Sequence, residues 1–545
     1  MSPTSTRLAF LVPLVLFLAL ALYQIELPGP NYDEAVEAKP AVQLLRGQPV
    51  EAHRDAVISL FGQRLPLMIV DYVGALNVYA LLAYFKLGGI GVASMRLWSI
   101  TVGVLILWLS YRVGMRAGGR RAGLLAALIL AVQPSFVFFA RQGIYVTNTT
   151  IALSLGILLA LAQLALTGRW RWWFLAAFLA GLGLWAKFIM LWPLVATAAL
   201  APVAWWGRTG LGIQSAVGFG PRALLRPRPL LGALAAFLLG LAPLIVFNLK
   251  TGATIRTFTG AFGQSYYGLS NKNYLDNLLR RWQQLGDFLA GDHFWYLGGN
   301  FADALARPFW LAGLLLLLLG LVWTWRTPAR RSLILRGLCI YAFTLLLLLQ
   351  SPLTPTALWY THLAIFSPYL ALGIALAAES VLVRLRGAWS TAALIFAALI
   401  LFSSLRADLG YHRALAASGG YADHSDASYR LAAYLSEHGI GQPYALDWGF
   451  DAPLILVSRG QVNPIEIFGY ERVDAPPDGF ADLLRPLLAP GAVFLVHAPD
   501  RTNFPGRREA LLQMAGEMGM HPETLAVIRE RSGAPHTEVW RLVTD

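Results

Sequence analysis

Acidic residues are few in the first 405 residues of this 545-residue chain, and their positions limit the chemistry that the sequence can support. Twelve occur there, and none lies between Asp71 and Asp276. Two of them, Asp33 and Glu34, are neighbours in the segment NYDEAVEAKPAVQLLRG. A carboxylate held in place can act as a general base, and adjacent acids raise one another's pKa. Asp33, with Glu34 beside it, is therefore a candidate for proton transfer.

The same segment has a purely structural interpretation. Asn31 can cap a helix, Glu34 at the third helical position completes a capping box, and acids in a first turn interact favourably with the helix dipole. The residues alone leave both interpretations open.

Composition indicates the setting of these residues. Only 13% of the residues are charged and 57% are hydrophobic, whereas soluble domains carry about 25% charged residues. These values exclude an ordinary cytosolic enzyme, a disordered chain and a disulfide scaffold, and they predict a polytopic membrane protein. The single cysteine, Cys339, lies in an apolar run, so there is no intrachain disulfide and no cysteine-based metal site.

Stretches without Asp, Glu, Lys or Arg mark the membrane spans, because a helix needs about 20 apolar residues to cross the bilayer core of roughly 30 Å. We expect eleven spans, and the first apolar run is counted as one of them because no signal-peptide cleavage site follows it. The run 337–378 counts as two, since SPLTPT divides it. The predicted spans are 8–25, 95–111, 122–140, 142–168, 172–186, 188–207, 229–249, 308–325, the two halves of 337–378, and 387–405.

Arginines predict the orientation, since short cytoplasmic loops collect basic residues. Arginines follow every even-numbered span, which puts the N-terminus in the cytoplasm and everything after Leu405 outside. All the acids before that point except Glu379 then lie on the outer face. The net charge of +13 divides into +19 before residue 406 and −6 after it. Because most of the surplus lies in cytoplasmic loops, the charge reflects topology and gives no case for nucleic acid.

The remaining segments are predicted to lie outside the membrane. Residues 28–90 form an outer loop in which the short apolar run Tyr72 to Phe85 is an interfacial helix, and residues 250–307 form a second outer loop. Residues 406–545 have the composition of a soluble α/β domain. We expect its strands at PYALDWGF and AVFLVHAP, helices at 427–438 and 506–519, and a hairpin around Ser532. The strands suggest a Rossmann-like sandwich without the GxGxxG fingerprint.

Several blocks of sequence resemble a known family. An Asp-Glu pair directly after the first span, heading an interfacial helix that ends LLRG, is similar to the membrane glycosyltransferases of the GT-C fold. LPLMIVDYVGALNVYALLAYFKLGG, SMRLWSITVGVL, PSFVFFARQGIY, GLGLWAKF and LWYTHLAIFSPYLAL resemble later family blocks in the same order, over residues 8 to 380. The most similar branch comprises the protein O-mannosyltransferases, the lipid A aminoarabinose transferases and the bacterial Rgt-like enzymes.

The resemblance implies an activity and a location. Such enzymes take a sugar from a polyprenyl-phosphate carrier and pass it to an acceptor hydroxyl on a glycan, lipid or protein outside the membrane. Inversion at the anomeric carbon with Asp33 as general base is the expected mechanism, and the phosphate leaving group needs positive charge rather than a general acid. The expected location is the inner membrane of a bacterium, in contact with membrane lipids.

The resemblance also implies further site residues. Asp71 matches a second acidic residue of the family's outer loop, and Tyr72 beside it lines the pocket or anchors at the headgroups. Arg141 and Lys187 are candidate phosphate ligands, since charges near a membrane are usually functional, although both can snorkel to headgroups. Further candidates in LWYTHL are Tyr360 and His362, which align with a block that meets the carrier phosphate.

One departure from the family pattern is visible. Many relatives have an Asp several residues after the Arg that matches Arg141, whereas this chain has Tyr145 and Asn148. No cofactor is predicted. A divalent metal could bind Asp33, Glu34 and Asp71 together, but carboxylates alone do not show that one does.

Two other classes of function stay open. A secondary transporter would carry interrupted helices in matched halves, and no repeat of the first half is visible in the second. A non-catalytic membrane scaffold would only present the outer domain, and it would not need a groove for a carrier lipid beside Asp33.

Overall fold

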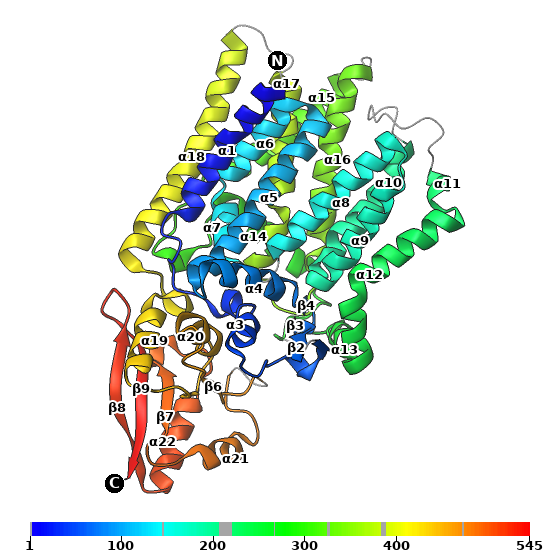
Figure 1. Cartoon of the computed structure of the whole chain (residues 1–545). Helices are drawn as coiled ribbons and strands as arrows, with labels where there is room; N and C mark the ends of the chain where they lie inside the picture. Colours follow the sequence, from blue (N-terminus) through cyan, green and yellow to red (C-terminus); the bar gives the residue numbers. More distant parts are fainter. Residues whose placement is uncertain are drawn as a thin grey trace.

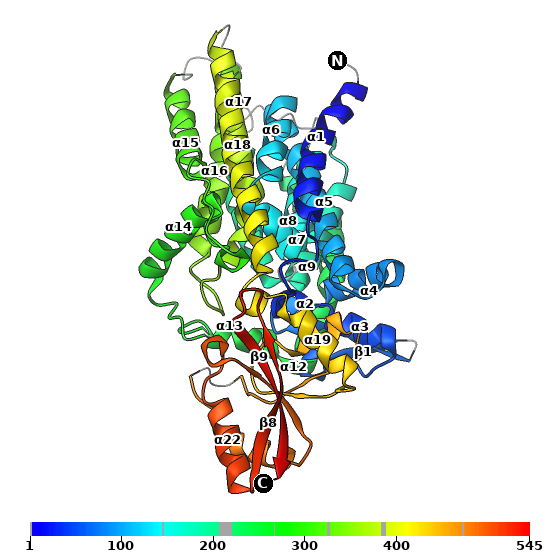
Figure 2. The same cartoon turned by 90° about the vertical axis from the view of Figure 1, so that its left-hand side faces the viewer.

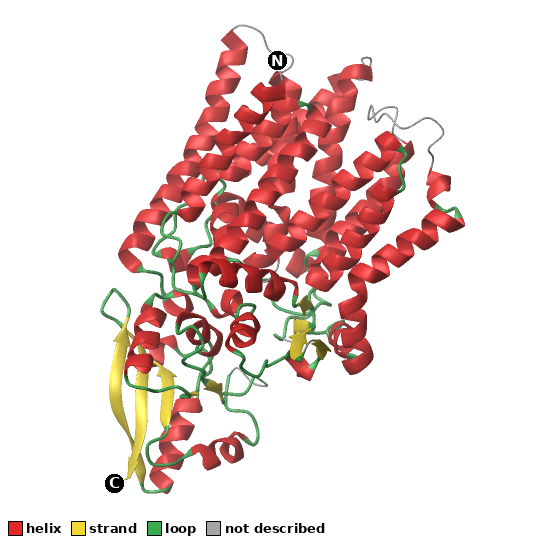
Figure 3. Ribbon diagram, viewed as in Figure 1, coloured by secondary structure: helices red, strands yellow, loops and turns green. Residues whose placement is uncertain are grey.

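The computed structural model describes residues 3–60, 62–143, 147–206, 221–265, 267–323, 328–382, 388–470 and 474–544. A bundle of long apolar helices forms one part, and a smaller domain with strands lies at one end of it (Figures 1 and 3). The N-terminal ends of α1, α16 and α18 lie at the opposite end of the bundle (Figure 1). Short helices and hairpins fill the layer between the bundle and the domain (Figure 2).

Ten of the eleven predicted spans each fall on one helix among the described residues, and the span 122–140 falls on the bent pair α6–α7. Runs of Leu, Ala and Val satisfy their own backbone hydrogen bonds only as helices in an apolar medium. By length and composition, six helices in the described ranges can cross a membrane, or seven if the bent pair α6–α7 is one span. The helices α9 and α10 and the apolar part of α1 are shorter. The bundle helices are α1 (Pro3–Leu22), α5 (Val92–Gly118), α6 (Arg120–Ala131), α7 (Pro134–Gln142), α8 (Thr147–Thr167), α9 (Arg171–Ala186), α10 (Leu191–Trp206), α12 (Pro227–Thr251), α15 (Ala306–Trp323), α16 (Pro328–Gln350), α17 (Ser367–Leu382) and α18 (Ala388–Ser418).

Two sequence features shape the bundle. Pro134 occupies the first turn of α7, and the chain bends there by 66° after α6. Glycines bring α9 and α12 into backbone contact, since a Cβ at Gly181 would lie 2.1 Å from the carbonyl oxygen of Phe237 and one at Gly240 would lie 2.4 Å from that of Phe178. Close approach at small residues is how helices pack in membranes.

The layer between bundle and domain is built from both predicted outer loops. The first loop forms α2 (Tyr32–Ala35), α3 (Lys39–Arg46), the antiparallel pairs β1 (Val57–Leu60) with β2 (Gln63–Pro66) and β3 (Met68–Val70) with β4 (Val73–Gly74), and α4 (Leu76–Gly88). The second forms α13 (Ala253–Gly260) and α14 (Tyr274–Ala290). The helix expected over residues 72–85 begins four residues later, because residues 73–74 pair with β3.

The C-terminal domain is an α/β domain, as expected. Its sheet has the order β6-β5-β7-β9-β8, with β6, β5 and β7 parallel and β9 antiparallel to both β7 and β8. The predicted hairpin around Ser532 is the β8–β9 pair. The elements are α19 (Ala427–Glu437), β5 (Tyr444–Ala445), α20 (Asp451–Val457), β6 (Ile465–Glu466), α21 (Phe480–Leu484), β7 (Val493–His497), α22 (Arg507–Glu517), β8 (Met520–Arg529) and β9 (Pro535–Thr544).

Helices cover both faces of this sheet. On β7, Phe494 and Val496 join one apolar core, while Leu495 between them joins the other, as the two-residue period of a strand requires. The strand expected at PYALDWGF is shorter than predicted. Asp447 ends it by accepting backbone hydrogen bonds from Trp448, Asn503 and Phe504.

The boundary predicted at residue 405 falls inside α18, which runs without a break from the bundle to Ser418. The domain also contacts the first outer loop, because α20 packs its Ala452, Ile455 and Leu456 against alanines of α2 and α3. The C-terminal domain is thus packed against α2 and α3 near the N-terminus of the chain.

Candidate active site

The segment that carries Asp33 forms the short helix α2 with the predicted cap. The side-chain oxygen of Asn31 accepts a hydrogen bond from the Asp33 amide at 2.9 Å, and Glu34 Oε1 accepts one from the Asn31 amide at 3.1 Å. The capping box is complete and fixes the backbone on both sides of Asp33. The Asp33 side chain itself is half-buried.

Glu34 forms a buried ion pair with Arg96, a residue that was not among the predicted site residues. Arg96, near the start of α5, donates from Nη2 to Glu34 Oε1 at 2.5 Å and from Nε to Oε2 at 3.2 Å. Its Nη1 also donates to the carbonyls of Ile25 and Pro28, both at 2.9 Å. Burial raises the pKa of Glu34, although Arg96 acts to lower it. Glu34 therefore ties the segment of Asp33 to α5.

Glu37, four residues after Asp33, is a second acid that the sequence analysis passed over. Its Oε2 accepts a hydrogen bond from Asn77 at 2.5 Å, and its Oε1 is buried with no hydrogen-bond partner among the described residues. Burial raises the pKa of Glu37 to about 8, and the charge of Asp33 also raises it, while Asn77 and Lys187 act to lower it. Glu37 therefore belongs to the same electrostatic site as Asp33.

Lys187 occupies the turn between α9 and α10, in extended backbone conformation. The turn is held to the first outer loop, since Val73 forms a β-bridge with Lys187 and the amide of Phe188 donates to the carbonyl of Tyr72 at 3.1 Å. Lys187 Nζ donates to Thr147 Oγ1 at 2.9 Å. Burial lowers the pKa of Lys187 to about 8, against the influence of Glu37 and Asp33, which raise it. Asp33 and Glu37 are therefore close enough to Lys187 to influence its charge.

A cavity of about 630 Å³ begins at Lys187. Three of the predicted site residues line it, namely Tyr72, Lys187 and His362. Most of the remaining wall is apolar, and it continues to exposed side chains, with Leu191 42% and Phe262 87% exposed. The cavity therefore has a cation at its inner end and an apolar wall that reaches the surface of the bundle.

Tyr360 and His362 lie on different sides of the 3₁₀ helix η4 (Tyr360–Phe366). His362 is buried in the wall of the 630 Å³ cavity, and Arg281 of α14 approaches its Nδ1 at 3.1 Å. Tyr360 donates to Asp287 Oδ2 at 2.8 Å and stacks on His293 outside that cavity. The structure thus brings His362, but not Tyr360, to the cavity of Lys187.

The Asp71 carboxylate is fully hydrogen-bonded by residues of the layer between the bundle and the C-terminal domain. Arg54 donates to both of its oxygens at 2.6 and 2.8 Å, Thr257 donates at 2.7 Å, and His53 lies 2.7 Å away. Partial burial acts to raise the pKa of Asp71, but these hydrogen bonds outweigh it and hold the pKa far below its usual value. Asp71 is therefore a permanently charged anchor for this layer.

Arg141 is fully buried beneath the chain between α1 and α2. Its Nη2 donates to the carbonyls of Gln24 at 2.5 Å and Leu27 at 3.1 Å, and its Nη1 lies 3.4 Å from His412. Arg141 does not line the cavity of Lys187. Tyr145, which follows it in the sequence, lies outside the described residues.

A divalent metal bound by Asp33, Glu34 and Asp71 would need the three carboxylates to lie together. Across the described ranges, no three His, Cys, Asp or Glu side chains come together in a way that could hold a metal ion. These three acids form no such group, since Glu34 is bound by Arg96 and Asp71 by Arg54.

Comparisons with known proteins identify the fold. Residues 75–219 match the family model described as dolichyl-phosphate-mannose-protein mannosyltransferase. A search of curated proteins finds no match. Among solved structures, ArnT from Cupriavidus metallidurans bound to undecaprenyl phosphate is 13% identical, with a TM-score of 0.58 over 99% of this chain and 98% of that one. ArnT in the apo state gives the same identity and TM-score over 96% and 97%. The oligosaccharyltransferase of Archaeoglobus fulgidus is 12% identical, with a TM-score of 0.52 over 91% and 70%.

These findings define the class of the protein. It is an integral membrane protein with the GT-C fold, and residues 75–219 resemble the dolichyl-phosphate-mannose-protein mannosyltransferases. The resemblance seen in the sequence is thereby confirmed.

Proposed function

We propose that this protein transfers a sugar from a polyprenyl-phosphate carrier to an acceptor hydroxyl, with inversion of configuration. The observation that carries the proposal is the 630 Å³ cavity, whose largely apolar wall includes Lys187, a cation that Asp33 and Glu37 are close enough to influence. Such a cavity suits an isoprenoid chain with an anionic headgroup. The ArnT structure that aligns with 99% of this chain was solved with bound undecaprenyl phosphate.

In the proposed reaction, Asp33 accepts the proton of the acceptor hydroxyl as that oxygen attacks the anomeric carbon. The new C–O bond forms while the bond from the anomeric carbon to the phosphate oxygen breaks, and the carrier phosphate leaves with the electron pair. Lys187 stabilises its negative charge, since a preorganised cation in a dry site lowers the barrier. A single displacement without an enzyme nucleophile inverts the anomeric centre.

The remaining acids support this reaction indirectly. Glu34, tied to Arg96, positions Asp33 in α2, and Asp71 anchors the loop layer that holds Tyr72 against Lys187. Arg141 and Tyr360 are not included among the groups that meet the carrier phosphate.

We propose the orientation that the arginines predict, with the N-terminus in the cytoplasm of a bacterium and the C-terminal domain outside. The site then faces the extracytoplasmic side, because α2 and α3 lie at the end of the bundle that carries the domain (Figure 2).

The first test is the variant Asp33→Asn, assayed in membranes with a labelled polyprenyl-phosphate sugar. A general base contributes about 10² to 10⁴ in rate, so we expect transfer to fall by at least about a hundredfold. Asp55→Asn is the matched control, because Asp55 has an 84% exposed side chain in the same loop. Transfer by Asp33→Asn at the wild-type rate would overturn the role of Asp33. Solute uptake by proteoliposomes without any sugar transfer would indicate a transporter instead.

A further inference from the structure

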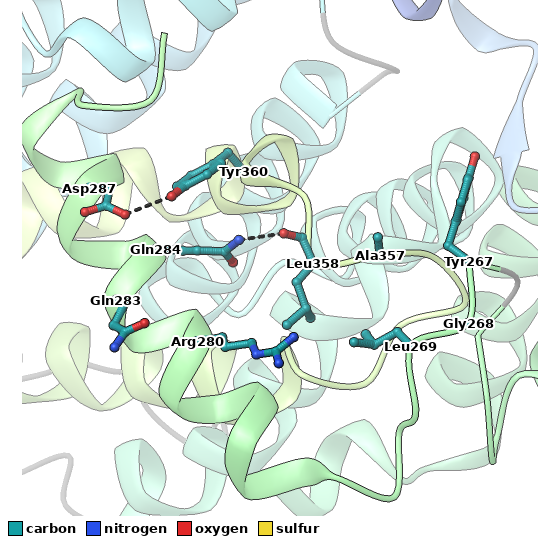
Figure 4. Close-up of a pocket in the computed structure, with 10 residues that line it drawn as sticks. All are labelled: Tyr267, Gly268, Leu269, Arg280, Gln283, Gln284, Asp287, Ala357, Leu358 and Tyr360. Atoms are coloured by element: carbon teal, nitrogen blue, oxygen red, sulfur yellow. Dashed lines mark hydrogen bonds between the residues drawn. The ribbon is translucent and has the colours of Figure 1, made fainter. Parts of the chain in front are cut away.

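A second cavity, of about 560 Å³, lies on the other side of the segment 353–362 from the cavity of Lys187. Thr354, Pro355 and Thr356 line the first cavity, while Ala357, Leu358 and Tyr360 line the second. Figure 4 shows the second cavity between α14, the segment 357–360 and the turn 267–269. One stretch of chain therefore serves as a wall for both.

A polar face of α14 forms one side of the second cavity. Arg280, Gln283, Gln284 and Asp287 all line it, and their spacing of three, four and seven residues places them on one side of a helix. Two of them are held to the opposite wall, since Gln284 Nε2 donates to the carbonyl of Leu358 at 2.6 Å and Asp287 accepts from Tyr360 at 2.8 Å (Figure 4).

The other two have unused hydrogen-bonding capacity. Arg280 and Gln283 are exposed, and neither has a hydrogen-bond or ion-pair partner in the part of the chain that the structure describes. Tyr267 lines the cavity and is 52% exposed, and it packs edge to face on Trp359 outside the lining, with ring centroids 5.8 Å apart. The cavity thus combines planar hydrogen-bonding groups with an exposed aromatic ring.

The side chains that line the second cavity favour some classes of ligand over others. An isoprenoid chain would bury Arg280 and Gln283 without partners, which is costly. A strongly anionic ligand would meet the carboxylate of Asp287 next to the single cation. A sugar suits both the polar and the aromatic groups of this cavity. Guanidinium and amide groups bind neighbouring sugar hydroxyls through paired hydrogen bonds, and an aromatic ring can cover the apolar C–H face of the sugar.

The same helix connects the two cavities. Arg281, next to Arg280, is fully buried and donates to Gln284 Oε1 at 2.9 Å and to the carbonyl of Trp359 at 2.9 Å, and it approaches His362 at 3.1 Å. A ligand between Arg280 and Leu358 would therefore lie one layer of chain away from the wall of the first cavity.

We propose that the 560 Å³ cavity binds a carbohydrate portion of the acceptor, an inference that rests on the proposed sugar transfer. The residues that recognise it are Arg280 and Gln283, with Tyr267 beside them in the wall. The acceptor of this enzyme is then a glycan or a glycosylated lipid, held beside the carrier site across the shared wall.

The test uses the full-length protein in lipid nanodiscs and an array of bacterial cell-envelope oligosaccharides as the probe. We expect the wild type to bind a subset of the array and the double variant Arg280→Met/Gln283→Leu to bind it at least tenfold more weakly. Arg256→Met is the matched control, since Arg256 lies on α13 and does not line the cavity. Equal melting temperatures of the three proteins would show that the substitutions leave the fold intact. Failure of the wild type to bind any oligosaccharide, or equal binding by the double variant, would overturn the proposal.

Kinetics separate this proposal from the proposed function. With a bound oligosaccharide as acceptor and a labelled polyprenyl-phosphate sugar as donor, we expect the double variant to raise the acceptor KM about tenfold and leave the donor KM unchanged. Binding that depends on Arg280 without any transfer by the wild type would refute the transferase and leave the sugar site standing. Transfer with an unchanged acceptor KM in the double variant would refute the sugar site alone.

Discussion

Burial and neighbouring charges together shift the pKa values of Glu37 and Lys187. Each is almost completely buried, and burial pushes the pKa of each to about 8 from opposite directions. Near neutral pH their protonation states therefore depend on each other and on the charge of Asp33. In the proposed reaction an acceptor hydroxyl would lose a proton, and groups that titrate close to the working pH suit such a step.

The raised pKa of Glu37 predicts a pH-dependent stability. Because burial raises the pKa of Glu37 to about 8, the folded protein keeps this proton up to about pH 8, whereas an unfolded chain loses it near the usual glutamate pKa of 4.5. Between these values the unfolded state binds fewer protons, so the free energy of unfolding falls as the pH rises. Glu37→Gln mimics the protonated form, and we expect its melting temperature to fall less than that of the wild type between pH 5 and pH 8, by a few degrees.

Thermal melting in detergent at pH 5, 6.5 and 8 measures this effect. Each pKa unit corresponds to about 1.4 kcal/mol, which is large enough to detect. Glu437→Gln, at an exposed position of α19, is the control and should follow the wild type. Parallel melting curves for Glu37→Gln and the wild type would contradict the prediction.

Part of the site is readable from single residues. The pattern N-Y-D-E predicts the capping box of Asn31 and Glu34, which the structure contains. An isolated lysine in an apolar run stands out, so Asp33 and Lys187 are candidates from the sequence alone. Glu37 had a signal as well, since it lies four residues after Asp33. The partners of Asp71 had none, because Arg54 and His53 reach it only through the folding of two hairpins.

At the scale of elements, apolar runs predict the helices well because length and hydrophobicity decide membrane insertion. The same runs do not show where a helix bends or continues. The 66° bend before Pro134 divides one predicted span, and α18 passes 13 residues beyond the predicted domain boundary. The sequence also could not predict that Tyr360 and His362 lie on different sides of η4. A 3₁₀ helix and an α-helix place residues 360 and 362 in different relative directions.

The contact of α20 with α3 carries a prediction of its own. Lys39, the first residue of α3, donates to Asp451 of α20 at 2.5 Å and to Glu51 at 2.6 Å, and Asp451 is buried. Removing one partner of a buried ion pair is destabilising, so Asp451→Asn should loosen α3 and the neighbouring segment of Asp33. We expect faster amide hydrogen exchange over residues 32–46 and roughly tenfold slower sugar transfer, consistent with a loss of about 1.4 kcal/mol.

Asp482→Asn is the matched control for this experiment, because Asp482 is exposed on α21 of the same domain. If Asp451→Asn and Asp482→Asn showed the same exchange as the wild type over residues 32–46, the domain would not be needed to hold α3 in place.

At the scale of the whole molecule, the cavity of Lys187 predicts that a carrier lipid accompanies the purified protein. We expect mass spectrometry of lipid extracts to find a polyprenyl phosphate with the wild type. Ala261→Trp should reduce it about tenfold, because Ala261 is 8% exposed in the cavity wall and a tryptophan there would fill the space of the lipid.

Leu315→Trp is the control, since Leu315 is 56% exposed on the outside of α15. Equal melting temperatures would exclude a folding defect, and the smaller substitution Ala261→Leu should give an intermediate loss. Undiminished polyprenyl phosphate in Ala261→Trp would show that the carrier binds elsewhere.

The contact between Lys39 and Asp451 joins residues that are 412 positions apart in the chain. During synthesis, α2 and α3 emerge before nearly all of the bundle, whereas α20 follows only after α18 has been made. The environment of Asp33 is therefore completed late in biogenesis, once every helix of the bundle has left the ribosome. A nascent chain that stalls before α20 would therefore lack the contact between Lys39 and Asp451.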